Sequence, residues 1–215
     1  MKELATRTAV GIVLILIALV AALLGGWPFA ILVAAVATIM YVEWSRIVAR
    51  WSFGWKLLGF IYCLLPAISL LWIRERAEFQ GIGKSFDLLI WVFLVVWSTD
   101  IGAYFAGRAI GGPKLAPSIS PNKTIAGLVG GVASAAVIAG AWANMVGLPA
   151  VLLWLAVPFA IAAQLGDLFE SGLKRRAGVK DSGTWLPGHG GLLDRLDGLV
   201  PVAVLTAALM LSGWL

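Results

Sequence analysis

The sequence predicts an all-α integral membrane protein, a polytopic bundle of about seven transmembrane helices. Composition is the first observation: 61% of the 215 residues are hydrophobic and 13% are charged. Soluble domains average about 45–50% apolar and about 25% charged residues. The second observation is that the apolar residues form runs of helix length rather than short alternating strands, which excludes a β-barrel.

Seven apolar segments each approach the ~20 residues that a helix needs to cross a bilayer. The second follows the first almost at once, across Gly25, Gly26, Trp27 and Pro28, and the first lacks a convincing small-x-small cleavage site, so we interpret them as a retained hairpin rather than a signal peptide. We expect residues 1–86 to form an N-terminal scaffold of three spans, and residues 87–215 a catalytic region of four spans and two cytoplasmic loops. The predicted spans are 9–26, 28–45, 55–73, 87–107, 125–146, 149–168 and 198–215.

Basic residues are distributed unequally between the two sides of these spans. With the N-terminus in the cytoplasm, all but three of the sixteen Lys and Arg residues lie on the cytoplasmic side. This is a positive-inside bias, and it persists when the five basic residues of segment 169–197 are discounted. We therefore expect a multi-pass protein of a bacterial cytoplasmic (inner) membrane, with segments 108–124 and 169–197 in the cytoplasm. The net charge of +5 then reflects topology and attraction to lipid phosphates, not nucleic acid.

Ionisable residues concentrate in segment 166–198, which also holds the single histidine, His189. Charged groups at a membrane are costly, so such a cluster indicates a functional site. Asp167, Glu170 and Lys174 share one helical face, and Asp194 and Asp197 share another. If the chain between them doubles back, the carboxylates converge and need a cation between them. The alternatives are that Asp167 pairs with Lys174, and that Asp194 and Asp197 pair with Arg195 or cap the last helix.

Two further segments carry polar residues. Asp100, Tyr104 and Arg108 form a polar stripe on the fourth span. These side chains either bind a ligand or contact one another between helices. Ser120 before Pro121 has the form of a helix N-cap, which would place Lys123 and Thr124 in the first turn of the fifth span, where an anion is favoured.

Glycines mark two other places in the sequence. The run 187–191, with glycine on both sides of His189, predicts a phosphate-binding turn in which the histidine contacts a phosphate or a carboxylate. The small residues of the fifth span, from Gly127 to Ser134, predict close helix packing and also permit a homodimer.

Taken together, these residues resemble the phosphatidate cytidylyltransferase (CDP-diacylglycerol synthase) family. The family signature has the form S-x-x-K-R-x4-K-D-x-[GSA]-x2-[LF]-[PG]-x-H-G-G-x-x-D-R-x-D, and the SPNKT and D-x3-Y-x2-G-R segments are similar to it too. The chain departs from the family at Ala126 and Gly198, and it is shorter than many members, so we expect a complete catalytic half on an abbreviated scaffold. The matching residues are Ser171, Lys174, Arg175, Lys180, Asp181, Gly183, Leu186, Pro187, His189, Gly190, Gly191, Asp194, Arg195 and Asp197.

The resemblance implies Mg²⁺-dependent cytidylyl transfer from CTP to phosphatidate, with pyrophosphate released, at the cytoplasmic ends of the C-terminal spans; a second cation is left open. It implies Asp167, Asp194 and Asp197 as metal ligands. The implied catalytic residues are Asp167, Lys174, Arg175, Lys180, Asp181, Asp194 and Asp197. The implied substrate-binding residues are Ser120, Lys123, Thr124, Arg108, Asp100, Tyr104, His189, Gly190, Gly191 and Arg195.

Two alternative functions stay open from the sequence. A cytidylyltransferase that acts on a prenyl-lipid phosphate would use the same headgroup chemistry. A transporter of an anionic substrate would also use intramembrane Asp and Arg, but it predicts interrupted helices in two repeats. The pattern of CDP-alcohol phosphotransferases is absent, because Leu199 and Val200 follow Asp197-Gly198 where that pattern needs Ala-Arg.

Overall fold

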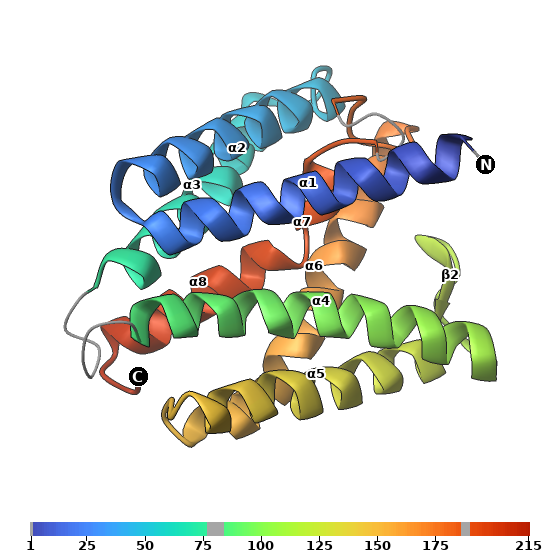
Figure 1. Ribbon diagram of the computed structural model, residues 1–215. Helices are drawn as coiled ribbons and strands as arrows, with labels where there is room; N and C mark the ends of the chain where they lie inside the picture. The colour runs from blue at the N-terminus through green and yellow to red at the C-terminus, as the bar shows by residue number, and fades with distance from the viewer. Residues whose placement is uncertain (1, 77–83, 186–189) are drawn as a thin grey trace.

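A computed structural model describes residues 2–76, 84–185 and 190–215, with side chains from residue 10 onward. Successive long helices run in alternating directions, so that the start of α1, the end of α4 and the end of α6 lie at one end of the bundle (Figure 1). The elements are α1 (Lys2–Leu24), α2 (Gly26–Ile47), α3 (Phe53–Glu75), α4 (Lys84–Ile110), β1 (Lys114–Ala116), β2 (Ser120–Thr124), α5 (Ile125–Met145), α6 (Val151–Ala177), α7 (Leu193–Leu196) and α8 (Leu199–Leu211).

The helices confirm a polytopic membrane protein. Among the described residues, α2 to α6 are each long and apolar enough to cross a membrane, and α1 carries the apolar stretch Val10–Leu24. The last predicted span, 198–215, is wrong in length, because α8 ends at Leu211 and Gly213 follows in a left-handed conformation with φ +77°. Thirteen residues reach about 20 Å, which is less than the ~30 Å of a bilayer core. The chain from α7 therefore enters α8 near the middle of the bundle (Figure 1).

Helix α6 extends well beyond the predicted span 149–168. It continues to Ala177 and ends at Gly178, whose φ of +72° is the left-handed conformation that glycine adopts at helix ends. This extension confirms that Asp167, Glu170 and Lys174 lie on one helical face.

The segment between α4 and α5 corrects a prediction. It forms an antiparallel hairpin in which Lys114 pairs with Thr124 and Ala116 with Ser120. Ser120 is therefore not a helix cap, and Lys123 and Thr124 precede the helix. The cap is Thr124, whose Oγ1 accepts a hydrogen bond from the N–H of Gly127 at 3.0 Å. Thr124 lies directly before the apolar run, so it can satisfy a free amide there, and the fixed φ of Pro121 suits a strand at a sheet edge as well as a helix start.

Small residues bring α4 and α5 into close contact. A Cβ atom at Gly130 would lie 2.2 Å from Cβ of Ala106, and one at Gly131 would lie 2.7 Å from the carbonyl oxygen of Thr99. The predicted close packing is confirmed, and it occurs within the chain. This glycine face is covered by α4, so a homodimer would need a different surface. The contact fixes the C-terminal half of α4 beside the hairpin and the start of α5.

The two proposed regions share packing. Helix α3 packs on α8, and α2 contacts α7, so contacts cross the boundary at residue 86. The division into a scaffold and a catalytic region stays a prediction.

The substitution Gly131→Ala tests the α4–α5 contact. Its methyl group would meet the backbone of α4, and overpacking of this kind costs about 1–3 kcal/mol. We expect a lower thermal unfolding midpoint in detergent. Gly140→Ala on the same helix is the control, because its Cβ would lie 3.6 Å from Leu153, an ordinary contact. Equal midpoints for the two variants would contradict this packing.

Candidate active site

A polar cavity of about 760 Å³ lies where α4, β2, α6 and α7 meet. Charged side chains from four separate stretches of the sequence line it, so the structure brings together most of the residues that the sequence indicated. Asn122, Gln164 and four small or apolar residues complete the walls. The predicted site residues in the lining are Asp100, Tyr104, Arg108, Lys123, Thr124, Asp167, Lys174, Asp194, Arg195 and Asp197.

The hairpin and α6 are joined by an ion pair inside this cavity. Lys123 Nζ on β2 lies 2.6 Å from Oδ2 of Asp167. The other oxygen of Asp167 accepts a hydrogen bond from Ser171 Oγ, one helical turn along, at 3.2 Å. The partner of Asp167 is therefore Lys123, and the pairing with Lys174 that the sequence left open is not formed.

Lys174 instead connects α6 to the segment before α8. Its Nζ lies 3.3 Å from Oε1 of Glu170 and 2.5 Å from Oδ1 of Asp194. All three side chains are nearly inaccessible to solvent, with exposed fractions of 11%, 0% and 10%. Removing one partner from such a buried group leaves an uncompensated charge, which typically costs 3–5 kcal/mol. Lys174 thereby holds Asp194 beside α6, the helix that carries Asp167.

Asp194 is also held by the backbone of residues 171–197, the signature segment, which carries the family pattern. It accepts hydrogen bonds from the N–H of Ser182 at 3.0 Å and the N–H of Gly191 at 2.9 Å. Burial alone would raise the pKa of Asp194, but the hydrogen bonds from Lys174, Ser182 and Gly191 outweigh it and hold the pKa below its ordinary value. Asp194 is therefore ionised in the folded protein at neutral pH.

Asp197 lies one turn beyond Asp194, as expected for two carboxylates on one helical face. It follows α7 in a helical conformation and accepts a hydrogen bond from the N–H of Gly198 at 2.7 Å. Burial raises the pKa of Asp197, and the negative charge of Asp167 raises it further. The two carboxylates therefore differ in their surroundings. The negative charge of Asp194 is balanced by Lys174, whereas Asp197 is buried near the negative charge of Asp167.

Several predicted residues lie outside the cavity lining. Lys180 and Asp181 are exposed, and Arg175 donates from Nε to the carbonyl oxygen of Ile119 in the hairpin at 3.2 Å. Ser120 pairs within the hairpin. Gly190 and Gly191 belong to the turn that surrounds Asp194. His189 lies outside the described residues, as do Leu186 and Pro187.

Glu43, a fully buried carboxylate on α2, supports the site although it was not among the residues predicted from the sequence. Its two oxygens accept hydrogen bonds from Ser182 Oγ at 3.1 Å and from the N–H groups of Leu192 at 3.1 Å and Leu193 at 2.8 Å. Glu43 thereby fixes two separate parts of the signature segment, at Ser182 and at the start of α7, where it satisfies free amides. The available signal was one acidic residue inside an otherwise apolar span, which the rule for intramembrane charges already marks as functional.

The same contact explains two glycines of the signature. A Cβ atom at Gly183 would lie 2.4 Å from Oε1 of Glu43, and one at Gly191 would lie 1.9 Å from Oγ of Ser182 and 2.8 Å from Oε2 of Glu43. Both positions therefore need glycine because the Glu43 carboxylate and the Ser182 hydroxyl that it binds occupy the space of a side chain. The glycine-rich turn is shaped by α2 as well as by its own sequence.

The donor set fits a divalent cation that arrives with a phosphate ligand. Within the described residues, no three Asp, Glu, His or Cys side chains form a ready-made metal site. Mg²⁺, however, usually takes only one or two carboxylates and completes its shell with water and substrate phosphates. Asp167 and Asp197 repel each other across the cavity, because the negative charge of Asp167 raises the pKa of Asp197. A bound cation between them would relieve this repulsion.

Comparison with known proteins agrees with this chemistry. Residues 51–212 match a family model described as "Cytidylyltransferase family". A "Phosphatidate cytidylyltransferase" of Brucella suis biovar 1 (strain 1330) is 46% identical over 178 residues, which are 81% of this chain and 62% of that protein. The protein of the same name from Staphylococcus aureus (strain COL) is 35% identical over 211 residues, 95% of this chain and 78% of that protein. The chain thus spans less than two thirds of the Brucella relative's length.

Glu43→Gln tests the link between α2 and the signature segment. The amide has one acceptor oxygen instead of two, so at least one buried donor loses its partner, at a cost of about 2 kcal/mol. We expect a lower unfolding midpoint and faster tryptic cleavage at exposed Lys180. Glu75→Gln is the control, because Glu75 accepts a hydrogen bond from the N–H of Gly26 at the start of α2, away from the signature segment. Unchanged cleavage at Lys180 in the Glu43 variant would refute the link.

Proposed function

The chain belongs to the cytidylyltransferase family, and on that premise we propose that it transfers the cytidylyl group of CTP to phosphatidate, giving CDP-diacylglycerol and pyrophosphate. One observation carries the proposal: the polar cavity places Lys123 and Lys174 beside a set of carboxylates, at an end of the membrane helices. Cations for a triphosphate and carboxylates for its metal are the two requirements of phosphate transfer.

The proposed reaction is a displacement at the α-phosphorus of CTP. A phosphate oxygen of phosphatidate forms the new P–O bond, and the bond between the α-phosphorus and the β-phosphate oxygen breaks to release pyrophosphate. Phosphate monoesters carry between one and two negative charges at pH 7, so the attacking oxygen needs no general base. Catalysis then consists of positioning and charge neutralisation.

The lysines of the cavity suit that role. Lys123 and Lys174 each contact a carboxylate, so each can exchange one of its contacts for a phosphate oxygen without leaving the cavity. Arg108 is exposed at the cavity wall, where Nη1 donates to the hydroxyl oxygen of Tyr104 at 3.0 Å. These three cations surround the space in which a triphosphate would lie.

We include Mg²⁺ in the proposal. Asp167, Asp194 and Asp197 would hold it, and when bound it would supply positive charge to the transferred phosphoryl group and the leaving pyrophosphate. The support is the donor set and the surplus of negative charge beside Asp197.

We also propose that the cavity end of the bundle faces the cytoplasm of a bacterial cell, across the inner membrane. The hairpin and the end of α6 lie at the same end as the start of α1, which is the side that the Lys and Arg distribution assigns to the cytoplasm (Figure 1). The relatives compared above are bacterial proteins. CTP would then reach the cavity from its own compartment.

Asp194→Asn tests the site. We expect the purified protein to release pyrophosphate from CTP only when phosphatidate and Mg²⁺ are present, and the variant to lose this activity by roughly 100-fold or more. Asp87→Asn is the matched control, because Asp87 lies in the first turn of α4, at the opposite end. Near-native turnover by a folded Asp194→Asn protein would show that Asp194 has no role in the reaction.

The acceptor is tested separately. We expect pyrophosphate release with phosphatidate and none above background with a prenyl-lipid phosphate of matched concentration in the same detergent. Chelation by EDTA should stop the reaction, and Mg²⁺ added in excess of EDTA should restore it. If the protein preferred the prenyl-lipid phosphate, phosphatidate would be wrong as the proposed substrate.

A further inference from the structure

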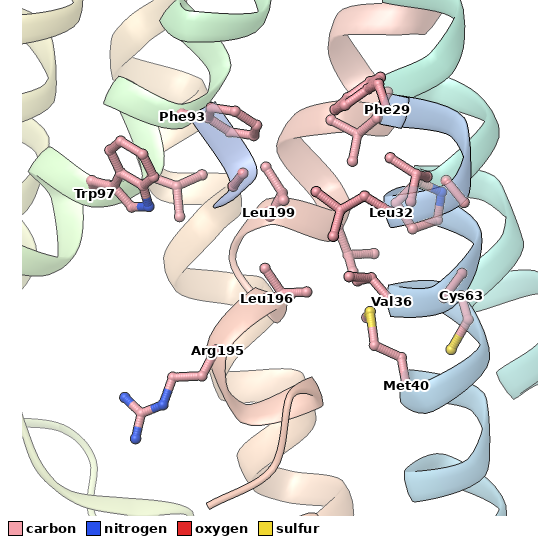
Figure 2. Close-up of a pocket in the computed structure, with 18 residues that line it drawn as sticks. Phe29, Leu32, Val36, Met40, Cys63, Phe93, Trp97, Arg195, Leu196 and Leu199 are labelled. Atoms are coloured by element: carbon pink, nitrogen blue, oxygen red, sulfur yellow. The ribbon is translucent and has the colours of Figure 1, made fainter. Parts of the chain in front are cut away.

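A second, apolar cavity of about 140 Å³ lies between α1, α2, α3, α4 and α8. Phe29, Leu32 and Val36 of α2 face Phe93 of α4 and Leu199 of α8 across it, as Figure 2 shows. Leu32, Val36 and Trp97 are only partly buried, so the cavity reaches the surface of the bundle. Its walls hold no carboxylate and one charged residue, among the residues that the structure describes.

That charged residue, Arg195, joins the two cavities. It lines the apolar cavity and also the polar cavity that contains Lys174 and Asp194. In Figure 2 the guanidinium group points away from the apolar side chains, whereas Leu196, the next residue, extends toward them. A molecule with an anionic head and an apolar tail can therefore lie along Arg195 with each part in a matching environment.

We propose that the apolar cavity holds the first part of one acyl chain of phosphatidate, while Arg195 contacts the lipid phosphate. The inference rests on the proposed function and adds a specific lipid subsite to it. An apolar cavity of about 150 Å³ is known to stay dry and to bind benzene, so this cavity accepts roughly six carbons of a chain. The remainder of the chain extends through the open side into the bilayer.

The role of this subsite is positioning rather than affinity. Lipid tails are as apolar as leucine side chains, so moving an acyl chain from the bilayer into the cavity gains little hydrophobic free energy. A chain fixed beside Arg195 does, however, hold the phosphate oxygen at the entrance to the polar cavity. Misplacement by about 1 Å can cost roughly 100-fold in rate. Occupation of the subsite should therefore raise kcat/KM, and kcat/KM should depend on the length of the acyl chain.

Val36→Phe fills the cavity and tests the inference. In mixed micelles, we compare dioleoyl phosphatidate with dibutyryl phosphatidate, whose four-carbon chains are shorter than the cavity. The ratio of kcat/KM values, dioleoyl over dibutyryl, should fall about tenfold in the variant. Ala35→Phe is the control: it adds the same ring one position away, on the exposed face of α2, and should leave the ratio as in the native protein.

Photo-crosslinking identifies the occupant directly. A phosphatidate with a diazirine near the carboxyl end of one acyl chain should label α2, α3 or α8 at cavity residues, and Val36→Phe should reduce that labelling. A phosphatidylcholine carrying the same diazirine should label these residues several-fold less. Equal labelling by both lipids would mean that any bilayer lipid fills the cavity, and would overturn the inference.

The outcomes separate the two proposals. If the native protein transfers cytidylyl groups to neither phosphatidate, the proposed function fails. If it uses both and Val36→Phe leaves the dioleoyl-to-dibutyryl ratio unchanged, the function stands and the acyl-chain subsite is wrong.

Discussion

The site depends on one buried ammonium group, that of Lys174. Its Nζ lies between Glu170 on its own helix and Asp194 near α7, so a single side chain holds the signature segment against α6. Without this charge, the buried carboxylates Glu170 and Asp194 would lie close together with no cation between them. In the proposed function, the same lysine and Lys123 are the ammonium groups that contact the triphosphate. Folding of the segment and the proposed binding of the nucleotide would then use the same charged group.

Helix contacts from both halves of the chain support this arrangement. Glycines on α5 let α4 approach closely, which places Asp100 and Arg108 opposite α6. On the other side, Glu43 of α2 receives three hydrogen bonds from the signature segment. A buried carboxylate with three donors is a rigid support, because breaking any one contact leaves a buried polar group unsatisfied. The walls of the polar cavity are thus held by the α4–α5 packing and by Glu43. In the proposed function, Lys123 and Lys174 exchange a carboxylate contact for a phosphate oxygen.

The sequence was sufficient for the parts that depend on composition and periodicity. It predicted the membrane helices, the polar face of α6, the shared face of Asp194 and Asp197 and the close packing of α5. It was insufficient where the outcome depends on contacts between distant segments. Thr124 rather than Ser120 caps α5 because the hairpin pairs residues on both sides of a turn, and Glu43 acts on residues about 140–150 positions away. Helix α8 is short because it begins near the middle of the bundle, after α7. Hydropathy does not indicate the depth at which a helix begins.

The central claim is that this cavity binds a metal-bound nucleotide between carboxylates and lysines of α6, β2 and α7. The most direct measurement is an anomalous difference map from crystals grown with CTP and with Mn²⁺ in place of Mg²⁺. The account predicts a manganese peak roughly 2.1 Å from an oxygen of Asp167, Asp194 or Asp197, with the triphosphate beside Lys123 and Lys174. A nucleotide and metal bound anywhere else on the protein, with this cavity empty, would contradict it.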